Sequence, residues 1–400
     1  MGSWRTLPLG EALTFQRGFD ITKDEQRDGP YSVISSSGPK STHAEYKVRG
    51  PGVIIGRKGS LGTVFYSEEH YWPHDTTLWI KDFHGNDARF AYYFLQTMGF
   101  ERLDAGASNP SLNRNHIHTI PVWWPPLSIQ RRIAQILKVY DELIENSQRR
   151  IKILESMARS LYRHWFVHFR FPGHDSVPRV PSPLGEIPQG WAVTTLDSLK
   201  AAQPYAINGG PFGSKLVSKD YIATGTPVIR GTNLSESGRF NPTGFVFVSA
   251  EKTQELRANL AKPGDIVVTQ RGTLGQIAMI PSGIGYEQFV ISQSQMKVTL
   301  DPAKSNREYV FFYLCSHESN QRIKNLASSS GVPHINLAVL REFQIVLPPR
   351  ELQARFGEFV LSTESAVEAL LRRVENLRRT RDLLLPRLLS GQIDVDAVTS

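Results

Sequence analysis

The sequence predicts an α+β chain, in which two mixed α/β domains are separated by two long helices that form an antiparallel coiled coil. The whole is expected to be a pseudo-two-fold internal repeat. Three observations predict this fold: a glycine-rich loop occurs twice, a Pro-Pro step followed by a helix occurs twice, and both helices carry an apolar seam. A chain of 400 residues is also long for a single core, which favours more than one domain.

The duplicated loop reads GRKGSLG at residues 56–62 and QRGTLG at residues 270–275. Each copy follows a Pro-Gly step and a short apolar run, which is typical of a buried strand ending in a turn. Each copy also places a basic residue before Gly and then Ser or Thr. The sequence therefore predicts the same strand-loop unit in both halves.

A second pair of segments keeps one constant offset between the halves. NPSLNRNHIHTIPVWWPP at 109–126 aligns with VPHINLAVLREFQIVLPP at 332–349, so that Pro110 falls on Pro333. The match continues into the helices, where Gln130 falls on Gln353. Each half also opens on a tryptophan, Trp4 or Trp191. We interpret these matches as an internal duplication.

The repeat sets the expected domain boundaries. We expect the two domains at 1–126 and 191–349, the two helices at 127–170 and 350–390, and a tail at 391–400. Between the halves, residues 171–190 contain recurrent prolines, which oppose a helix and favour an extended linker.

Apolar residues recur at alternating spacings of four and three along both helices, the pattern of a coiled-coil seam. Arg381 is the clear exception. Such a seam requires burial, and the nearest partner is the other helix. Antiparallel pairing would hold the two domains about one turn of DNA apart or a little more. Proteins that read DNA half-sites space their reading elements in this way. A coiled coil that serves only oligomerisation remains the alternative. The seam residues are Ile133, Leu137, Tyr140, Ile144, Ile151, Leu154, Leu161, Phe356, Val360, Val367, Leu370, Val374, Leu377 and Leu384.

Composition limits the class of protein. The net charge of +8 favours a polyanionic partner such as nucleic acid. The single cysteine, Cys315, excludes an internal disulfide. No apolar run is long enough for a membrane span and the N-terminus shows no signal pattern, so we expect a cytoplasmic protein.

Candidate DNA-contacting residues cluster in the repeated loops and turns. Glycine allows the backbone to approach a phosphate or a base edge closely, and arginine is the commonest reader of guanine. A tight structural turn remains the alternative explanation for the glycines. The candidates are Arg57, Lys58, Ser60, Asn113, Arg114, Lys215, Arg230, Asn233, Gln270, Arg271, Thr273, His334 and Asn336.

The sequence offers no convincing catalytic or metal-binding set. NPSL at 109–112 lacks the second proline and the aromatic residue of an amino-methyltransferase motif, and no P-loop or methyl-donor glycine fingerprint occurs. Asp28 with Glu45 and Lys47 makes a poor nuclease set without an equivalent in the second half. The histidines lack ligand spacing. We therefore expect no catalytic residue, no metal and no cofactor in this chain.

In this order and in duplicate, the motifs resemble the specificity subunit of type I restriction-modification systems. The resemblance covers essentially the whole chain. It rests on the two glycine loops, GGPFGS at 209–214, the helix entries PPLSIQRR and PPRELQAR, and the C-terminal RDLLLPRLLSGQIDV. Glu351 lies two residues before Gln353, whereas the first helix has no matching glutamate.

The resemblance implies a non-catalytic subunit. Each domain would be a target recognition domain that reads one half of a split, asymmetric target in double-stranded DNA. The helices would dock two adenine-methyltransferase subunits, which bind S-adenosylmethionine, and two motor-nuclease subunits, which use ATP and Mg²⁺, would join them. A methylation-only system, another restriction type, or a scaffold that reads no DNA remain the alternatives.

Overall fold

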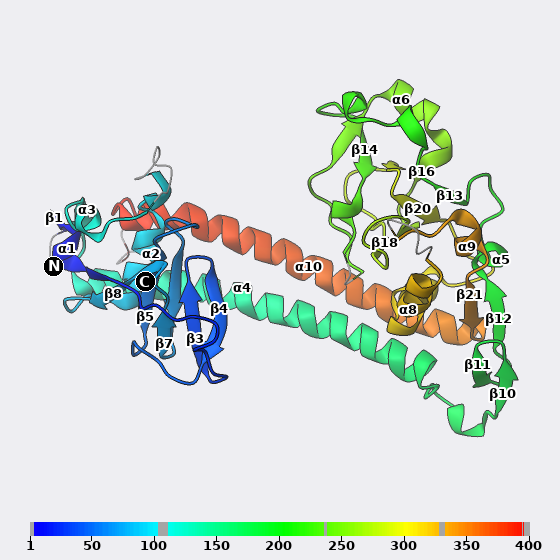
Figure 1. Cartoon of the computed structure of the whole chain (residues 1–400), viewed down its shortest axis with the longest axis horizontal. Helices are drawn as coiled ribbons and strands as arrows, with labels where there is room; N and C mark the ends of the chain where they lie inside the picture. Colours follow the sequence, from blue (N-terminus) through cyan, green and yellow to red (C-terminus); the bar gives the residue numbers. More distant parts are fainter. Residues whose placement is uncertain (1–3, 103–110, 236–237, 328–332, 394, 396–400) are drawn as a thin grey trace. The chain divides into compact units, whose positions relative to one another are not determined.

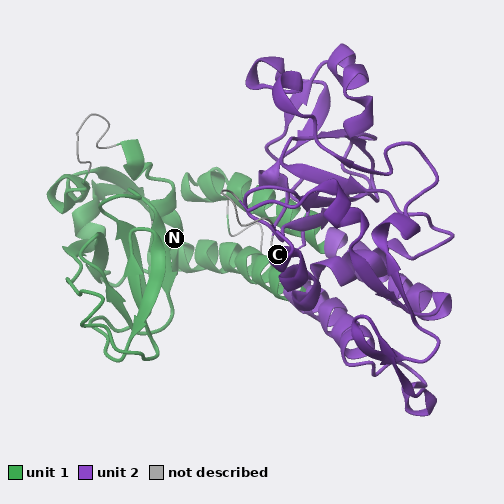
Figure 2. Ribbon diagram, turned by 45° about the vertical axis from the view of Figure 1, so that its right-hand side comes forward, with its two compact units in different colours: residues 1–150, 370–400 green, residues 151–369 purple. Residues whose placement is uncertain are grey.

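The computed structural model describes residues 4–102, 111–235, 238–327, 333–393 and 395. Pro110 and Val332 of the repeated turns, and most of the expected tail, lie outside these residues. The chain divides into two compact units, residues 1–150 with 370–400 and residues 151–369 (Figure 2). Within the described ranges, no helix is both long enough and apolar enough to cross a membrane.

The first unit contains the first domain, which comprises the elements before the first long helix. Two sheets form it, in the strand orders β2-β8-β5-β6 and β4-β3-β7, and β1 pairs antiparallel with β9. The elements are β1 (Arg5–Pro8), α1 (Leu9–Ala12), β2 (Thr14–Arg17), β3 (Tyr31–Ser35), β4 (Gly38–His43), β5 (Gly52–Gly56), β6 (Val64–Ser67), β7 (Tyr71–Pro73), β8 (Thr77–Asp82), α2 (Ala88–Gln96), α3 (Arg114–His118) and β9 (Pro121–Trp124).

The second unit contains the second domain, which comprises the elements from β12 to β21. Its sheets have the orders β13-β20-β17-β18 and β15-β14-β19-β16, and β12 pairs antiparallel with β21. The elements are β12 (Ala192–Thr195), α5 (Leu196–Leu199), β13 (Ile207–Gly209), β14 (Thr226–Ile229), β15 (Val246–Val248), α6 (Ala250–Glu255), β16 (Leu260–Ala261), β17 (Ile266–Thr269), β18 (Ile277–Met279), β19 (Phe289–Ile291), β20 (Gln295–Val298), α7 (Arg307–Cys315), α8 (His317–Asn325), α9 (Leu337–Arg341) and β21 (Gln344–Leu347).

The two domains share one topology. The four-stranded orders β2-β8-β5-β6 and β13-β20-β17-β18 correspond strand for strand, and β4-β3-β7 corresponds to β15-β14-β19. The second domain adds β16 at the edge of that sheet, where it pairs with β19. The predicted internal repeat is therefore present in the fold.

A glutamine follows each Pro-Pro step, and its side chain forms hydrogen bonds that link the domain to its long helix. Gln130 is buried; its Nε2 donates to the Pro125 carbonyl at 2.9 Å, and its Oε1 accepts from the Asp87 N–H at 2.9 Å. Gln353 repeats this pattern with Pro348 and Asn306, at 2.7 and 2.9 Å. In each case the second partner is the N-cap residue of a domain helix, α2 or α7. The glutamine is thus buried with both ends of its amide satisfied, as a buried polar group requires.

The two long helices are α4 (Leu127–Tyr162), extended by a π-helical turn at Arg163–Val167, and α10 (Arg350–Leu389). They run in opposite directions (Figure 1). In the first unit, the start of α4 and the end of α10 share one core, which contains Ile133, Leu137 and Leu388. In the second unit, the end of α4 and the start of α10 share another, which contains Tyr162 and Phe356. The predicted antiparallel coiled coil is therefore confirmed.

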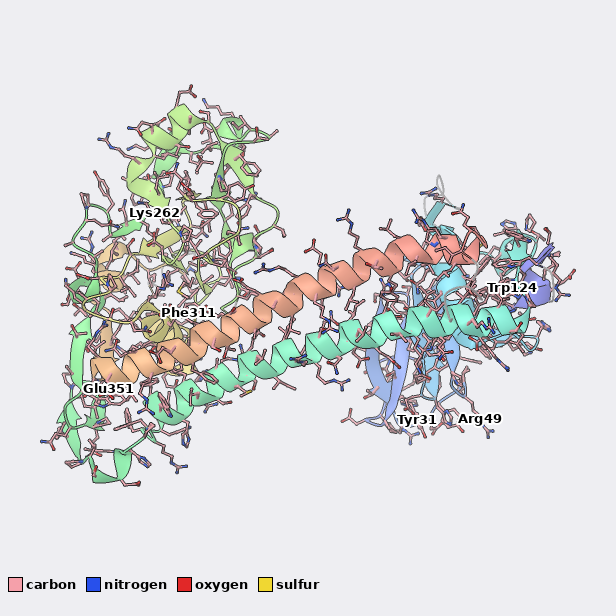
Figure 3. All side chains as sticks on the ribbon, turned by 180° about the vertical axis from the view of Figure 1, so that it is seen from behind. Tyr31, Arg49, Trp124, Lys262, Phe311 and Glu351 are labelled. Carbon is pink, nitrogen blue, oxygen red and sulfur yellow. The ribbon has the colours of Figure 1, made fainter. Side chains whose placement is uncertain are left out.

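The seam residues are all buried or half-buried. Ile133, Leu137 and Phe356 are fully enclosed, whereas Tyr140 and Leu154 keep part of their surface exposed. Among the half-buried members are also Leu161, Val367, Leu377 and Leu384. Figure 3 shows the side chains that both helices carry along their length.

Arg381, the exception in the seam, has a charged partner on the facing helix. Its Nη1 donates to Asp141 Oδ1 at 2.7 Å, and Asp141 Oδ2 accepts from the Tyr93 hydroxyl at 2.5 Å. The pair joins α10 to α4 and α4 to α2 within the first unit. A partly buried guanidinium is tolerated there because a carboxylate and a hydroxyl complete a hydrogen-bonded network.

The proline-rich segment at 171–190 differs from the expected extended linker. It forms the antiparallel hairpin of β10 (Arg179–Ser182) and β11 (Gly185–Pro188), and Phe171 and Ile187 are buried in the core of the second unit. Hairpin edges accept proline, because its missing N–H faces away from the partner strand. Apolar residues between the prolines then supply the burial that a solvated linker would lack.

Glu364 is a half-buried carboxyl group on α10 in the second unit. Burial, and then the nearby Glu308 carboxylate, raise its pKa to about 7, while Arg307 opposes the shift. Between about pH 4.5 and 7 the folded chain holds a proton that the unfolded chain releases, so stability should fall as pH rises through this window.

We expect Glu364→Gln to raise the thermal midpoint at pH 8 and to change it much less at pH 5, because the amide carries no charge to bury. Thermal unfolding at both pH values measures this. Glu358→Gln, on an exposed position of the same helix, is the matched control. Equal shifts at the two pH values would contradict the prediction.

Candidate nucleic-acid interface

The glycine loop of the first domain connects β5 to β6. The N–H groups of Arg57 and Lys58 both donate to the Thr76 carbonyl, at 2.8 and 3.1 Å. Gly59 and Gly62 have φ angles of 77° and 73°, in the left-handed region that favours glycine. At the surface of this fixed turn, Ser60 is exposed and Lys58 half-buried.

This loop is joined to the turn that precedes α3. Lys58 forms an antiparallel bridge with Ser111, and the Leu112 N–H donates to the Arg57 carbonyl at 3.0 Å. The two motifs that repeat in the sequence therefore lie side by side in the first domain. The sequence predicted each motif, but it contained no signal for the contact between them.

The second domain repeats the arrangement. Arg271 bridges His334, and the Ile335 N–H donates to the Gln270 carbonyl at 3.0 Å. Gln270 and His334 are half-buried, whereas Arg271 and Thr273 are exposed. Each domain thus presents one cationic glycine loop, fixed by the turn before its last short helix.

The Arg57 side chain is less available for a DNA contact than its position in the glycine loop led us to expect. Its Nη1 donates to the Asp75 carbonyl at 3.4 Å, and its side chain is half-buried. Burial, followed by the neighbouring Arg17 charge, lowers the pKa of its guanidinium. Both guanidinium groups contact Asp75, Arg17 through the carboxylate and Arg57 through the backbone carbonyl, and the Asp75 charge partly offsets the effect of Arg17 on Arg57.

Two of the three predicted asparagines, Asn113 and Asn336, are helix caps. The Asn113 side chain accepts from the Asn115 N–H at the start of α3, and the Asn336 side chain accepts from the Val339 N–H at the start of α9, both at 2.9 Å. Both asparagines are exposed, as is Arg114 in the first turn of α3. An N-cap role accounts for an asparagine at these repeated positions without any ligand.

Asn233 was predicted wrongly as a DNA contact. It is completely buried; its Oδ1 accepts from the Arg230 N–H at 2.9 Å, and its Nδ2 donates to the carbonyls of Asn241 and Thr243. These bonds hold a loop of the second domain together. A buried, satisfied amide cannot reach DNA.

Lys215 and Arg230, the other two candidates in this part of the second domain, differ from Asn233 in their burial. Lys215 is exposed at the end of a 3₁₀ turn, next to the strongly exposed Phe212. Arg230 is half-buried and donates to the Gly244 carbonyl at 2.8 Å. Among the described residues, no hydrogen bond or ion pair joins either side chain to the Arg271 loop.

A groove in the first domain has no counterpart among the sequence motifs. It has a volume of about 480 Å³, and its lining includes Arg17, Phe19, Lys47, Trp72 and Asp75. Arg17 Nη2 lies 2.9 Å from Asp75 Oδ2, and the Lys47 ammonium lies 4.8 Å from the centre of the Trp72 ring. These residues come from separate segments of the chain, so no local pattern marks them.

The described residues include one group that could hold a metal ion, formed by Asp20, His74 and Asp75. Asp75 already pairs with Arg17 and lies 3.0 Å from His74 Nδ1. Its carboxylate is thus already engaged by Arg17 and His74, and we assign no metal to the group.

A family model described as "Type I restriction modification DNA specificity domain" matches residues 1–156 and again residues 191–371. The two matches cover both domains, most of α4 and about the first half of α10. The chain belongs to the type I restriction-modification DNA specificity family. The resemblance drawn from the repeated motifs is therefore confirmed.

Individual members of the specificity family are similar over most of their length. The type I restriction enzyme MjaVIII specificity subunit of Methanocaldococcus jannaschii is 22% identical, over 98% of this chain and 93% of its own. A putative type I specificity subunit of Mycoplasma pneumoniae is 28% identical, over 87% and 86%. The crystal structure of an S subunit from M. genitalium covers 96% of both chains with a TM-score of 0.60 at 18% identity, which supports the fold.

Proposed function

We propose that this chain is the DNA-reading subunit of a type I restriction-modification complex, in which each domain reads one half of a split target in double-stranded DNA. The observation that carries the proposal is the duplicated interface. In both domains a cationic glycine loop is fixed by the turn before the last short helix, through the Lys58–Ser111 and Arg271–His334 bridges. A loop held in this way can present its cation to a phosphate or a base edge without losing much conformational freedom.

The two half-sites would differ in sequence. The loops offer lysine and serine in one domain and arginine and threonine in the other, and the partner residue changes from Ser111 to His334. Lysine acts as a point charge, whereas arginine presents a planar fork that suits guanine. An asymmetric target follows from these differences.

The long helices would dock the partner enzymes. Large apolar side chains remain exposed on their outer surfaces, including Ile153 and Met157 on α4 and Leu371 and Leu383 on α10. Two methyltransferase subunits, one for each half of the internal repeat, would bind here, and two restriction subunits would join them. Adenine methylation with S-adenosylmethionine, and cleavage driven by ATP with Mg²⁺, would take place on those partners, and this chain would be non-catalytic.

A map of methylated adenines tests the proposal. Cells that express the partner methyltransferase with this chain should show a split, asymmetric motif, and cells that lack the chain should not. Identical maps, with the methyltransferase still co-purifying with the chain, would instead identify a coiled-coil scaffold that reads no DNA. A methylation-only system would give the same motif without cleavage of unmodified DNA.

A further inference from the structure

Arg17 lies close to Arg57 of the glycine loop, since both side chains contact Asp75. Its position is fixed because the backbone at the next residue, Gly18, passes very close to the backbone of His74. A Cβ on Gly18 would lie 2.1 Å from the His74 carbonyl oxygen, so only glycine fits there. The Gly18 N–H donates to the Thr77 carbonyl at 3.0 Å, and the Phe19 N–H donates to the Pro73 carbonyl at 2.8 Å. The end of β2 is thereby held against the turn that carries Asp75.

Asp75 orients the Arg17 guanidinium. The Asp75 side chain is only 19% exposed, whereas that of Arg17 is 54% exposed. Within the part of the chain that the structure describes, the single hydrogen bond of the Arg17 side chain is the one from Nη2 to Asp75 Oδ2. An arginine has five N–H donors, so most of the fork remains for a ligand.

The groove beside Arg17 is chemically mixed. Lys47 is held over the face of Trp72, whose Nε1 donates to the Phe19 carbonyl at 3.2 Å. Asp20 and Asp75 also line the groove. The two carboxylates balance the charges of Arg17 and Lys47, so the lining offers a phosphate little net attraction, whereas the Arg17 fork can still bond the neutral acceptor edge of a base.

We propose that Arg17, oriented by Asp75, reads a guanine in the half-site bound by the first domain. The inference rests on the proposed function and names one residue that sets specificity. Guanine presents O6 and N7 in the major groove, and a held arginine fork matches this pair of acceptors. Asp75 is a positioning residue, because it acts through Arg17.

The equivalent position of the second domain carries no arginine. Gly210 repeats the close approach of Gly18, since a Cβ there would lie 1.9 Å from the Ser292 carbonyl oxygen, and its N–H donates to the Gln295 carbonyl as that of Gly18 does to Thr77. The residue before it, equivalent to Arg17, is Gly209, which has no side chain. Arg17 therefore affects one half-site only.

The test is a map of methylated adenines for the assembled complex carrying Arg17→Ala or Arg17→Lys. We expect discrimination for a guanine to fall about 10- to 100-fold in one half of the motif. This should be the same half that Lys58→Ala weakens. The other half should be unchanged, which also shows that the variant folds and assembles. Arg17→Lys should relax specificity too, because lysine keeps the charge but lacks the fork.

Arg27→Ala is the matched control. Arg27 is an exposed arginine of the same domain that pairs with Glu45 at 2.5 Å, outside the groove lining. It should leave the motif unchanged. A motif that stays intact in both Arg17 variants would overturn the inference while leaving the proposed function standing. Absence of any split motif with the unaltered chain would overturn both.

Discussion

Replacing Lys58 and Arg271 together with alanine is expected to weaken binding of the assembled complex to its target on the order of 100-fold. Each substitution removes the cation of one glycine loop, and a good contact from such a side chain to a base is worth about 1–3 kcal/mol. The dependence of affinity on salt should also become less steep, by roughly one unit of slope for each phosphate that the complex no longer neutralises. Titration of labelled target DNA at several salt concentrations measures both effects.

Single substitutions separate the two loops. Lys58→Ala should degrade recognition of one half-site and Arg271→Ala recognition of the other. The matched control is Arg27→Ala with Arg179→Ala, which removes the same charge from exposed positions outside the loops. If this control weakens binding as much as the loop variant does, the interaction depends on net charge and the loops have no special role.

Phe356→Ala should destabilise the second unit by about 3–5 kcal/mol. Phe356 is fully buried where α10 meets α4 and the second domain, with ring centres 5.2 Å from both Phe166 and Phe312. Removing the ring leaves a cavity among aromatic groups that are fixed by three elements. These are α4 with its π-helical turn, α7 and α10, so the surroundings can collapse only in part.

Urea unfolding followed by tryptophan fluorescence measures this change, because Trp191 lies in the same core. Leu361→Ala is the control: it removes an apolar side chain from the same helix, but from a position that is 45% exposed. We expect that change to cost less than about 1 kcal/mol. Equal losses would mean that the seam of α10 does not hold the unit together.

The repeated architecture could be predicted from the sequence because its signals are local. Neighbouring residues are enough to recognise a glycine after a cation, a Pro-Pro step, or an apolar seam with a seven-residue repeat. The sequence also showed that Gln130 and Gln353 repeat, but it did not reveal the hydrogen bonds that these side chains form. Each binds the N-cap residue of a helix more than forty positions earlier, Asp87 or Asn306, and no short pattern reveals a bond of that range.

The candidate site was only partly predictable for the same reason. Asn233 has the residue type of a base reader, but its burial depends on the loop at 241–243 that closes over it. Arg17 had no motif around it, and its environment is created by Gly18, Lys47, Trp72 and Asp75 together. The π-helical end of α4 and the β10–β11 hairpin were likewise set by packing in the second unit. Composition alone predicted a linker in the latter region.

We further propose that the paired helices set the gap between the two half-sites in the DNA target. This proposal is tested most directly by inserting one heptad into α4 after Ser147 and one into α10 after Val374. The facing pair Asp141 and Arg381 fixes the register of the two insertions. Seven residues lengthen a helix by about 10 Å, which corresponds to roughly three base pairs of DNA.

A map of methylated adenines should then show both half-sites unchanged and the gap between them longer by about three base pairs. That result would establish the helices as the spacer and the domains as independent readers. Methylation at the original gap would contradict the account, because the spacing would then be set by something other than this helix pair.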